Sequence, residues 1–141
     1  MKGEQGYFYD NRLCGALPAG CGADKMKTMI VKRAADAAEF RPDRMGKSTL
    51  FQGEQLFAGL NSFEPGQEHA AHTHAGQDKL YVVLRGEAEV QIGESRDLLA
   101  RGDVAFAPAG VVHSIRNPGP ERLVVMAVLA PPPAPQKPLA T

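Results

Sequence analysis

Residues 66–86 read GQEHAAHTHAGQDKLYVVLRG, and this stretch combines turn glycines, two closely spaced histidines and an apolar run. Leu80–Leu84 is apolar at every position, which predicts a strand with both faces buried. If the segment around His72 and His74 is also extended, the two side chains project from the same face with Cα atoms roughly 6.5–7 Å apart. Two imidazoles at that separation can bind one metal ion.

Short apolar runs separated by turn residues continue on both sides of this stretch. Residues 87–92 alternate, with Ala88, Val90 and Ile92 on one face and charged or amide side chains on the other. Only residues 34–40 have the pattern of a helical turn. The Gly and Pro turns between short strands predict an all-β sandwich or barrel. The other predicted strands are 28–33, 49–51, 56–63, 98–100, 104–107, 111–115 and 123–129.

The composition describes a chain of 141 residues, long enough for one domain with its own hydrophobic core. Lys and Arg number 16 and Asp and Glu also number 16, so the net charge of zero provides no basic field for nucleic acid or an anionic membrane. No apolar run approaches the roughly 18–20 residues of a membrane helix. We therefore expect a soluble cytoplasmic protein with neither nucleic acid nor membrane as a partner.

The ends of the chain differ from its centre. Residues 1–27 show no sustained hydrophobic periodicity, which predicts an irregular arm. The series of predicted strands occupies residues 28–130. Residues 131–141 begin with three prolines, which predicts an extended tail. Cys14 and Cys21 are too few for a disulfide framework, so reduced thiols are expected. The residues before them lack the apolar core of a signal peptide.

The spacing of glycines, histidines and one proline matches two known motifs in register. Gly66, His72, His74 and Gly86 fit the first motif of the cupin superfamily, and fifteen residues later a second motif fits Gly102, Pro108, Gly110, His113 and Asn117. Over residues 28–130 the sequence therefore resembles a small single-domain cupin. The resemblance implies a double-stranded β-helix, or jelly roll, with a metal site or pocket inside the barrel, and a homodimer.

Three histidines that converge inside a small barrel suit one divalent transition metal ion, namely Zn, Fe, Mn, Ni or Cu. His113 is the third of them because it opens a strand after the turn at Pro108. His69 has the opposite parity to His72 and His74 on an extended strand, so a solvated or turn position is expected for it.

One position departs from the cupin pattern. Proteins that resemble this sequence commonly have a glutamate as fourth metal ligand where this chain has Lys79, and an ammonium cannot bind a metal. Three interpretations follow. In the first, Gln77 or Asp78 replaces the glutamate as a ligand. In the second, the three histidines bind the metal alone and water fills the open positions, and in the third, Lys79 and the histidines bind an anionic or polar ligand without a metal. Tyr81 shares the parity of Lys79, so both are candidates to line the substrate pocket.

The function expected from this pattern is binding of a small organic molecule inside the barrel. If the chain is an enzyme, a metal-dependent dioxygenase is the first interpretation, and a cupin isomerase is an alternative. The competing class is a non-catalytic cupin that binds or senses a sugar or an organic anion, since Lys79 is the kind of change that accompanies loss of a metal ligand. The apolar runs 80–84 and 123–129 exceed what one small barrel covers, which also favours a homodimer.

Overall fold

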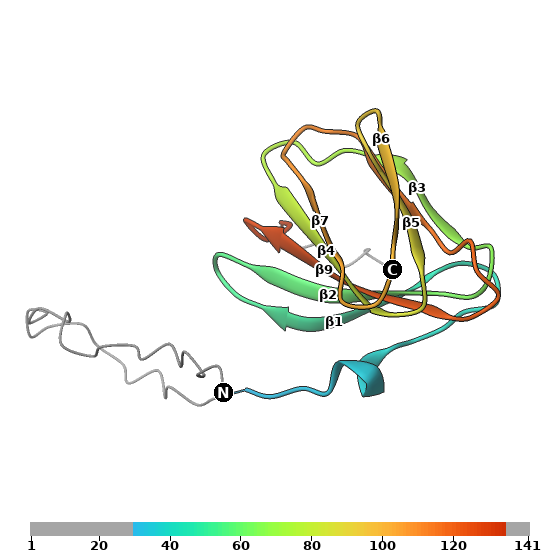
Figure 1. Cartoon of the computed structure of the whole chain (residues 1–141). Helices are drawn as coiled ribbons and strands as arrows, with labels where there is room; N and C mark the ends of the chain where they lie inside the picture. Colours follow the sequence, from blue (N-terminus) through green and yellow to red (C-terminus); the bar gives the residue numbers. More distant parts are fainter. Residues whose placement is uncertain (1–29, 135–141) are drawn as a thin grey trace, which may run out of the picture. The chain divides into compact units, whose positions relative to one another are not determined.

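The computed structural model describes residues 30–134, and all of these except Ile30 belong to the unit Val31–Thr141. Its elements confirm the predicted all-β fold (Figure 1). A short 3-10 turn, η1, covers Ala34–Ala37, within the range where a helical turn was expected. The strands that follow are β1 Gly46–Gln52, β2 Phe57–Phe63, β3 Glu68–His72, β4 Asp78–Arg85, β5 Ala88–Ile92, β6 Ser95–Leu99, β7 Val104–Ala107, β8 His113–Arg116 and β9 Leu123–Ala130.

The strands form two antiparallel sheets that face each other across a shared interior (Figure 1). The larger sheet has the order β1-β2-β9-β4-β7, and the smaller sheet has the order β3-β8-β5-β6. Strands far apart in the sequence are therefore neighbours, as β2 and β9 are. The interior is filled from both sheets by a buried cluster that includes Phe63, Tyr81, Val90, Ile115 and Val125.

Strand β5 shows the predicted alternation, because Ala88 and Val90 are buried. The prediction that both faces of 80–84 are buried was wrong. Tyr81 and Val83 point into the interior, whereas Leu80, Val82 and Leu84 are only half-buried on the outer face of β4. The physical reason is that the outer face of the larger sheet is covered only in part, by the segment that contains η1 and Phe40.

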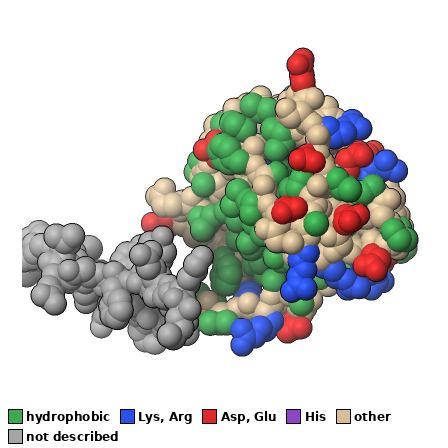
Figure 2. Space-filling model, in the orientation of Figure 1, with side chains coloured by type: hydrophobic (Ala, Val, Ile, Leu, Met, Phe, Trp, Pro, Cys, Tyr) green, Lys and Arg blue, Asp and Glu red, His purple; other side chains and the backbone are tan. Residues whose placement is uncertain are grey.

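Other sequence predictions require smaller corrections. Residues 30–33 form no strand, and residues 28 and 29 of that predicted strand lie outside the described residues. The predicted arm at 1–27, with Cys14 and Cys21, also lies outside them, and the predicted tail at 131–141 is described only as far as Ala134. Within the described part, no helix is long and apolar enough to cross a membrane. On the face shown in Figure 2, acidic and basic side chains are interspersed, with apolar side chains exposed beside them.

Two motif residues lie directly after the ends of strands, Gly86 after β4 and Asn117 after β8. Asn117 is fully buried, and its Nδ2 donates hydrogen bonds to the carbonyl oxygens of Phe63 and Glu121, at 3.3 and 2.7 Å. Gly86 adopts φ +77°, and a Cβ placed there would lie 2.6 Å from the carbonyl oxygen of Arg122. Both residues therefore have structural roles.

Candidate metal centre

A β-bulge in β3 determines where its histidines point. Against β8, His69 pairs with Ile115 and His72 pairs with His113, so three steps along β3 oppose two steps along β8. The extra residue forms a β-bulge. On a regular strand, side chains three positions apart project from opposite faces, but the bulge brings those of His69 and His72 to the same face. Because register partners project from the same face, His69 and His72 both face the interior with the buried Ile115 and His113.

The expectation that His69 is solvated was therefore wrong. Its ring centroid lies 4.0 Å from that of His72, and its Nδ1 is buried with no hydrogen-bond partner. Parity on a regular strand predicted the opposite face, and no residue type in the sequence marks the bulge. His69 is half-buried, lies beside His72 and lines the adjoining cavity, so it belongs to the candidate site, and sequence reasoning missed it.

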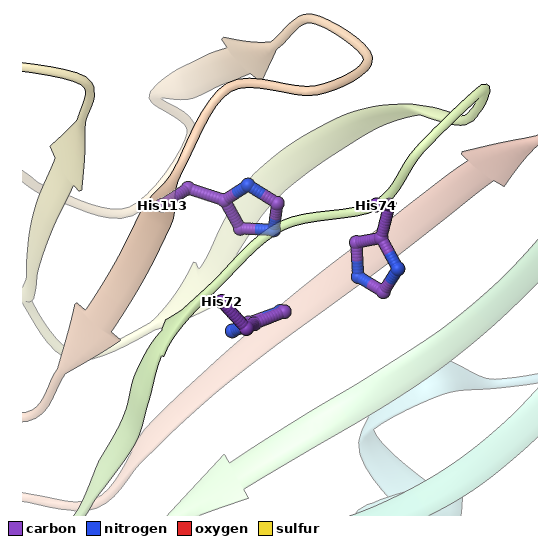
Figure 3. A group of neighbouring side chains, drawn as sticks. All are labelled: His72, His74 and His113. Atoms are coloured by element: carbon purple, nitrogen blue, oxygen red, sulfur yellow. The ribbon is translucent and has the colours of Figure 1, made fainter.

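The structure brings the three motif histidines together (Figure 3). One ligand atom from each of His72, His74 and His113 lies within 4.8 Å of the other two. Strand β3 ends at His72, so His74 projects from the loop that follows rather than from an extended strand. That loop is tied to the β7–β8 turn, since the Gly110 N–H donates a 2.9 Å hydrogen bond to the carbonyl of His74.

Backbone carbonyls fix the orientation of two of the three imidazoles. Nδ1 of His72 lies 2.7 Å from the Ala70 oxygen, and Nδ1 of His113 lies 2.9 Å from the Val111 oxygen. A carbonyl only accepts hydrogen bonds, so each Nδ1 carries the proton and each Nε2 keeps its lone pair. Nε2 of His74 and of His113 are buried without partners. The unprotonated Nε2 atoms of His72 and His113 are thus able to bind a metal, as metal-binding histidines require, although Nε2 of His72 also lies 3.5 Å from Nζ of Lys79.

Burial keeps these imidazoles neutral. Loss of solvent lowers the pKa of His72 and His113, and it lowers the pKa of His74 to about 4 and that of His69 to about 3. Neighbouring positive groups, chiefly Lys79 for His74 and His72 for His69, contribute to these lowered pKa values, but less than burial does. Near neutral pH the side chains are therefore in the unprotonated form that binds a metal ion.

The two pocket candidates, Lys79 and Tyr81, lie inside the barrel. Lys79 is only 3% exposed, and its Nζ lies 3.5 Å from Nε2 of His72 and 4.7 Å from the ring centroid of Tyr81. Burial, with a smaller effect from Lys47, lowers the pKa of Lys79 to about 8. Tyr81 is fully buried, its hydroxyl has no hydrogen-bond partner, and burial raises its pKa.

The structure does not bring Gln77 or Asp78 to the three histidines. The Gln77 side-chain amide donates a 2.9 Å hydrogen bond to the carbonyl of Pro131. The Asp78 carboxylate accepts a 2.9 Å hydrogen bond from the Ala109 N–H. Both side chains hold neighbouring loops instead, so the fourth ligand expected from this pair is absent from the cluster.

A cavity of about 490 Å³ opens beside the cluster, a size that suits a small molecule. His69, His74 and Lys79 form one part of its wall. Apolar side chains such as Phe57 and Leu129 form another part. The site can therefore place the carbon skeleton of a small organic molecule against apolar wall and its polar end against the imidazoles.

Two facing antiparallel sheets with an interior histidine cluster and an adjoining cavity define an all-β barrel protein with a candidate metal centre. Residues 59–129 match the family model described as Cupin domain, and the chain belongs to the cupin family. The jelly-roll barrel inferred from the two motifs is thereby confirmed.

Relatives and solved structures agree with this assignment. The chain is 31% identical over 85 residues to the oxalate-binding protein of Thermotoga maritima, covering 60% of this chain and 69% of the relative. The crystal structure of TT1209 from Thermus thermophilus is 40% identical, with a TM-score of 0.72, and the match covers 74% of this chain and all of that one. A protein with a double-stranded β-helix domain from Klebsiella pneumoniae is 28% identical, with a TM-score of 0.69, over 74% of this chain and 91% of that chain.

Proposed function

We propose that this cupin binds one divalent transition metal ion (Zn, Fe, Mn, Ni or Cu) through Nε2 of His72, His74 and His113. The observation that carries the proposal is the approach of three ligand atoms to within 4.8 Å of one another. Three nitrogens bound tetrahedrally at about 2.1 Å from a metal lie roughly 3.4 Å apart. Each nitrogen would move by only about 1 Å to bind, which small rotations of the imidazoles provide.

The ligand chemistry of the site also fits a metal. The donor atoms are neutral imidazole nitrogens, a set suited to Zn, Cu, Fe and Ni. The unpartnered Nε2 atoms of His74 and His113 are buried polar groups that a metal would satisfy. Three protein ligands leave coordination positions open toward the cavity, which is typical of sites that accept a water or a substrate.

We further propose that the cavity binds a small organic molecule next to the metal. The similarity to a protein named for binding oxalate supports a ligand of this size. The cavity of about 490 Å³ adjoins the histidines and has apolar side chains along part of its wall. Phe57 and Leu129 would hold the carbon skeleton, while His69 and His74 would contact its polar end.

Catalysis and passive binding are the two versions of this proposal. A bound metal would supply Lewis-acid or dioxygen-dependent redox chemistry to a molecule that it chelates, and a dioxygenase reaction would use it in that way. The observation that favours a binding or sensing role is Lys79, whose ammonium occupies the cluster in place of a carboxylate. Oxygen uptake with candidate diketones, catechols or thiols separates the two, because only the dioxygenase consumes oxygen when the ligand is added.

The experiment that tests the metal is elemental analysis of the purified protein. We expect close to one transition metal ion per chain in the wild type and a sharp loss in His74→Ala, which removes one of three ligands. His69→Gln is the matched control, because His69 contacts His72 but is not one of the three clustered ligands. We expect this control to retain most of its metal. Equal or absent metal in the wild type and His74→Ala would refute the metal site.

We also propose that the chain forms a homodimer through the outer side of β4 and β7. Leu80 pairs with Phe106 and Val82 with Val104, so the four apolar side chains share one face. Phe106 and Val104 are 54 and 55% exposed on the edge strand of the larger sheet. Apolar patches of this kind favour association. Sedimentation should show a dimer in the wild type and a monomer in Phe106→Ser; a monomeric wild type at micromolar concentration would refute the proposal.

A further inference from the structure

The charged groups in the cavity wall have one sign. Lys47 and Lys79 line the cavity of about 490 Å³, and no Asp or Glu is among the described residues that line it. Lys47 pairs with the buried, cavity-lining Asn61 between β1 and β2, so its side chain projects on the interior side of the larger sheet. The cavity thus has an exposed ammonium at Lys47 and a buried one at Lys79.

Within the part of the chain that the structure describes, no carboxylate supplies the counter-charge that the buried ammonium of Lys79 normally requires. Among residues 30–134, its Nζ has one polar contact, to Nε2 of His72 at 3.5 Å, which is at the limit of a hydrogen bond. The other neighbour is the face of the Tyr81 ring, at 4.7 Å from its centroid. Buried cations are usually paired with an anion, because burial without a partner is costly.

A metal at the histidines would increase this imbalance. Three imidazoles contribute no negative charge, so the metal would keep its full charge beside Lys79. Binding of the metal would also take Nε2 of His72, which is the one hydrogen-bond acceptor of Lys79. The carboxylates nearest in sequence do not compensate, since that of Asp78 accepts a hydrogen bond from the Ala109 N–H.

From this geometry we infer that the ligand of the cavity is a small organic carboxylate. One carboxylate oxygen would bind the metal while the same group accepts a hydrogen bond from Nζ of Lys79, and Lys47 at the cavity wall would attract the anion. The apolar part of the wall, which includes Phe57 and Leu129, favours a carboxylate with a carbon skeleton over an inorganic anion. The inference rests on the proposed metal site and narrows its ligand to one chemical class.

The test compares anionic and neutral probes of the same shape. Binding of pyruvate, oxalate, pyruvamide and inorganic phosphate is measured by calorimetry on the zinc-loaded and the metal-free protein, at pH 7 and low salt. We expect pyruvate to bind at least tenfold more tightly than pyruvamide, and both pyruvate and oxalate to bind more tightly than phosphate. Equal affinity for pyruvate and pyruvamide would overturn the inference, and so would tighter binding of phosphate than of both carboxylates.

Charge-removing variants test the two lysines. Lys79→Met keeps an unbranched side chain of similar length, and we expect it to weaken carboxylate binding at least tenfold. Lys47→Met should weaken it severalfold. Lys32→Met is the matched control, because Lys32 lies over the Phe51 ring and is not among the residues that line the cavity. Unchanged binding in Lys79→Met would overturn the role of that lysine, and the wild-type comparison of pyruvate with pyruvamide decides the ligand class even if a variant fails to fold.

Metal analysis of the same samples separates this inference from the function on which it rests. Metal in the wild type without a preference for carboxylates would overturn the inference and leave the metal site standing. The protein could instead fail to bind zinc but still prefer carboxylates, with a preference that depends on Lys79. That result would refute the metal site and support the anion site. Failure of the carboxylate inference and failure of the metal site therefore give different combinations of metal content and ligand affinity.

Discussion

Nζ of Lys79 lies 3.5 Å from Nε2 of His72, inside the barrel and within the group of imidazoles that we propose as a metal site. Unit charges 4 Å apart interact by about 4 kcal/mol at the effective dielectric constant of a protein site. A protonated Lys79 therefore opposes a bound dication unless an anion is present or the lysine is neutral. Burial of Lys79 lowers its pKa to about 8, which reduces this opposition.

Lys79→Glu should tighten metal binding. The substitution replaces a repelling ammonium with a carboxylate that can bind the metal, on a strand position that faces the interior. We expect the Kd for zinc to fall at least tenfold, measured by competition with a chelator. Lys32→Glu changes the net charge equally but outside the cavity, so it should leave the Kd within about twofold. An unchanged Kd in Lys79→Glu would contradict a metal bound at Nε2 of His72.

The stability of the metal-free protein should fall below pH 6.5. Burial lowers the pKa of His69 to about 3 and that of His74 to about 4, whereas the unfolded chain titrates near 6.5. Between these values the unfolded state binds protons that the folded state does not, so the free energy of unfolding decreases as the pH falls. Urea denaturation should give a lower midpoint at pH 5 than at pH 7.5.

His69→Gln isolates one histidine in this pH dependence. The amide does not titrate, so the difference in midpoint between pH 7.5 and pH 5 should be smaller than in the wild type. The comparison is made after removal of metal with a chelator, so that only protons compete for the imidazoles. A variant with the same pH dependence as the wild type would show that His69 is not buried as described.

Gly86→Ala should destabilise the barrel more than Gly66→Ala. Both glycines have a positive φ, +77° and +82°, which strains any other residue by about 1 kcal/mol. A Cβ at position 86 would in addition lie 2.6 Å from the carbonyl oxygen of Arg122, whereas one at position 66 meets nothing within 4 Å. We expect losses of about 3 kcal/mol and about 1 kcal/mol in urea denaturation. Equal losses would show that the contact with Arg122 relaxes at no cost.

Much of the fold could be predicted from sequence because its signals are local. Alternation in 87–92 predicted β5, and the glycine and proline turns separated the strands correctly. The burial of 80–84 could not be predicted in the same way, because it depends on how much of the outer sheet face other segments cover. The helical turn at 34–40 covers that face only in part.

The candidate site was predicted in part for a related reason. Motif spacing identified His72, His74 and His113, which the structure brings together. Parity placed His69 on the wrong face, because a single bulge between His69 and His72 shifts the register. The hydrogen bond from Gln77 to Pro131 joins residues 54 positions apart, so no local pattern in the sequence shows it.

Anomalous X-ray scattering from crystals of the purified protein locates a metal ion directly and so shows whether one transition metal ion binds between His72, His74 and His113. Data collected on both sides of the absorption edge of the metal found by elemental analysis identify its position and its element. We predict one anomalous peak per chain, about 2.1 Å from Nε2 of each of the three histidines. Crystals of metal-containing protein with no peak at the histidines, or with a peak elsewhere, would contradict the account.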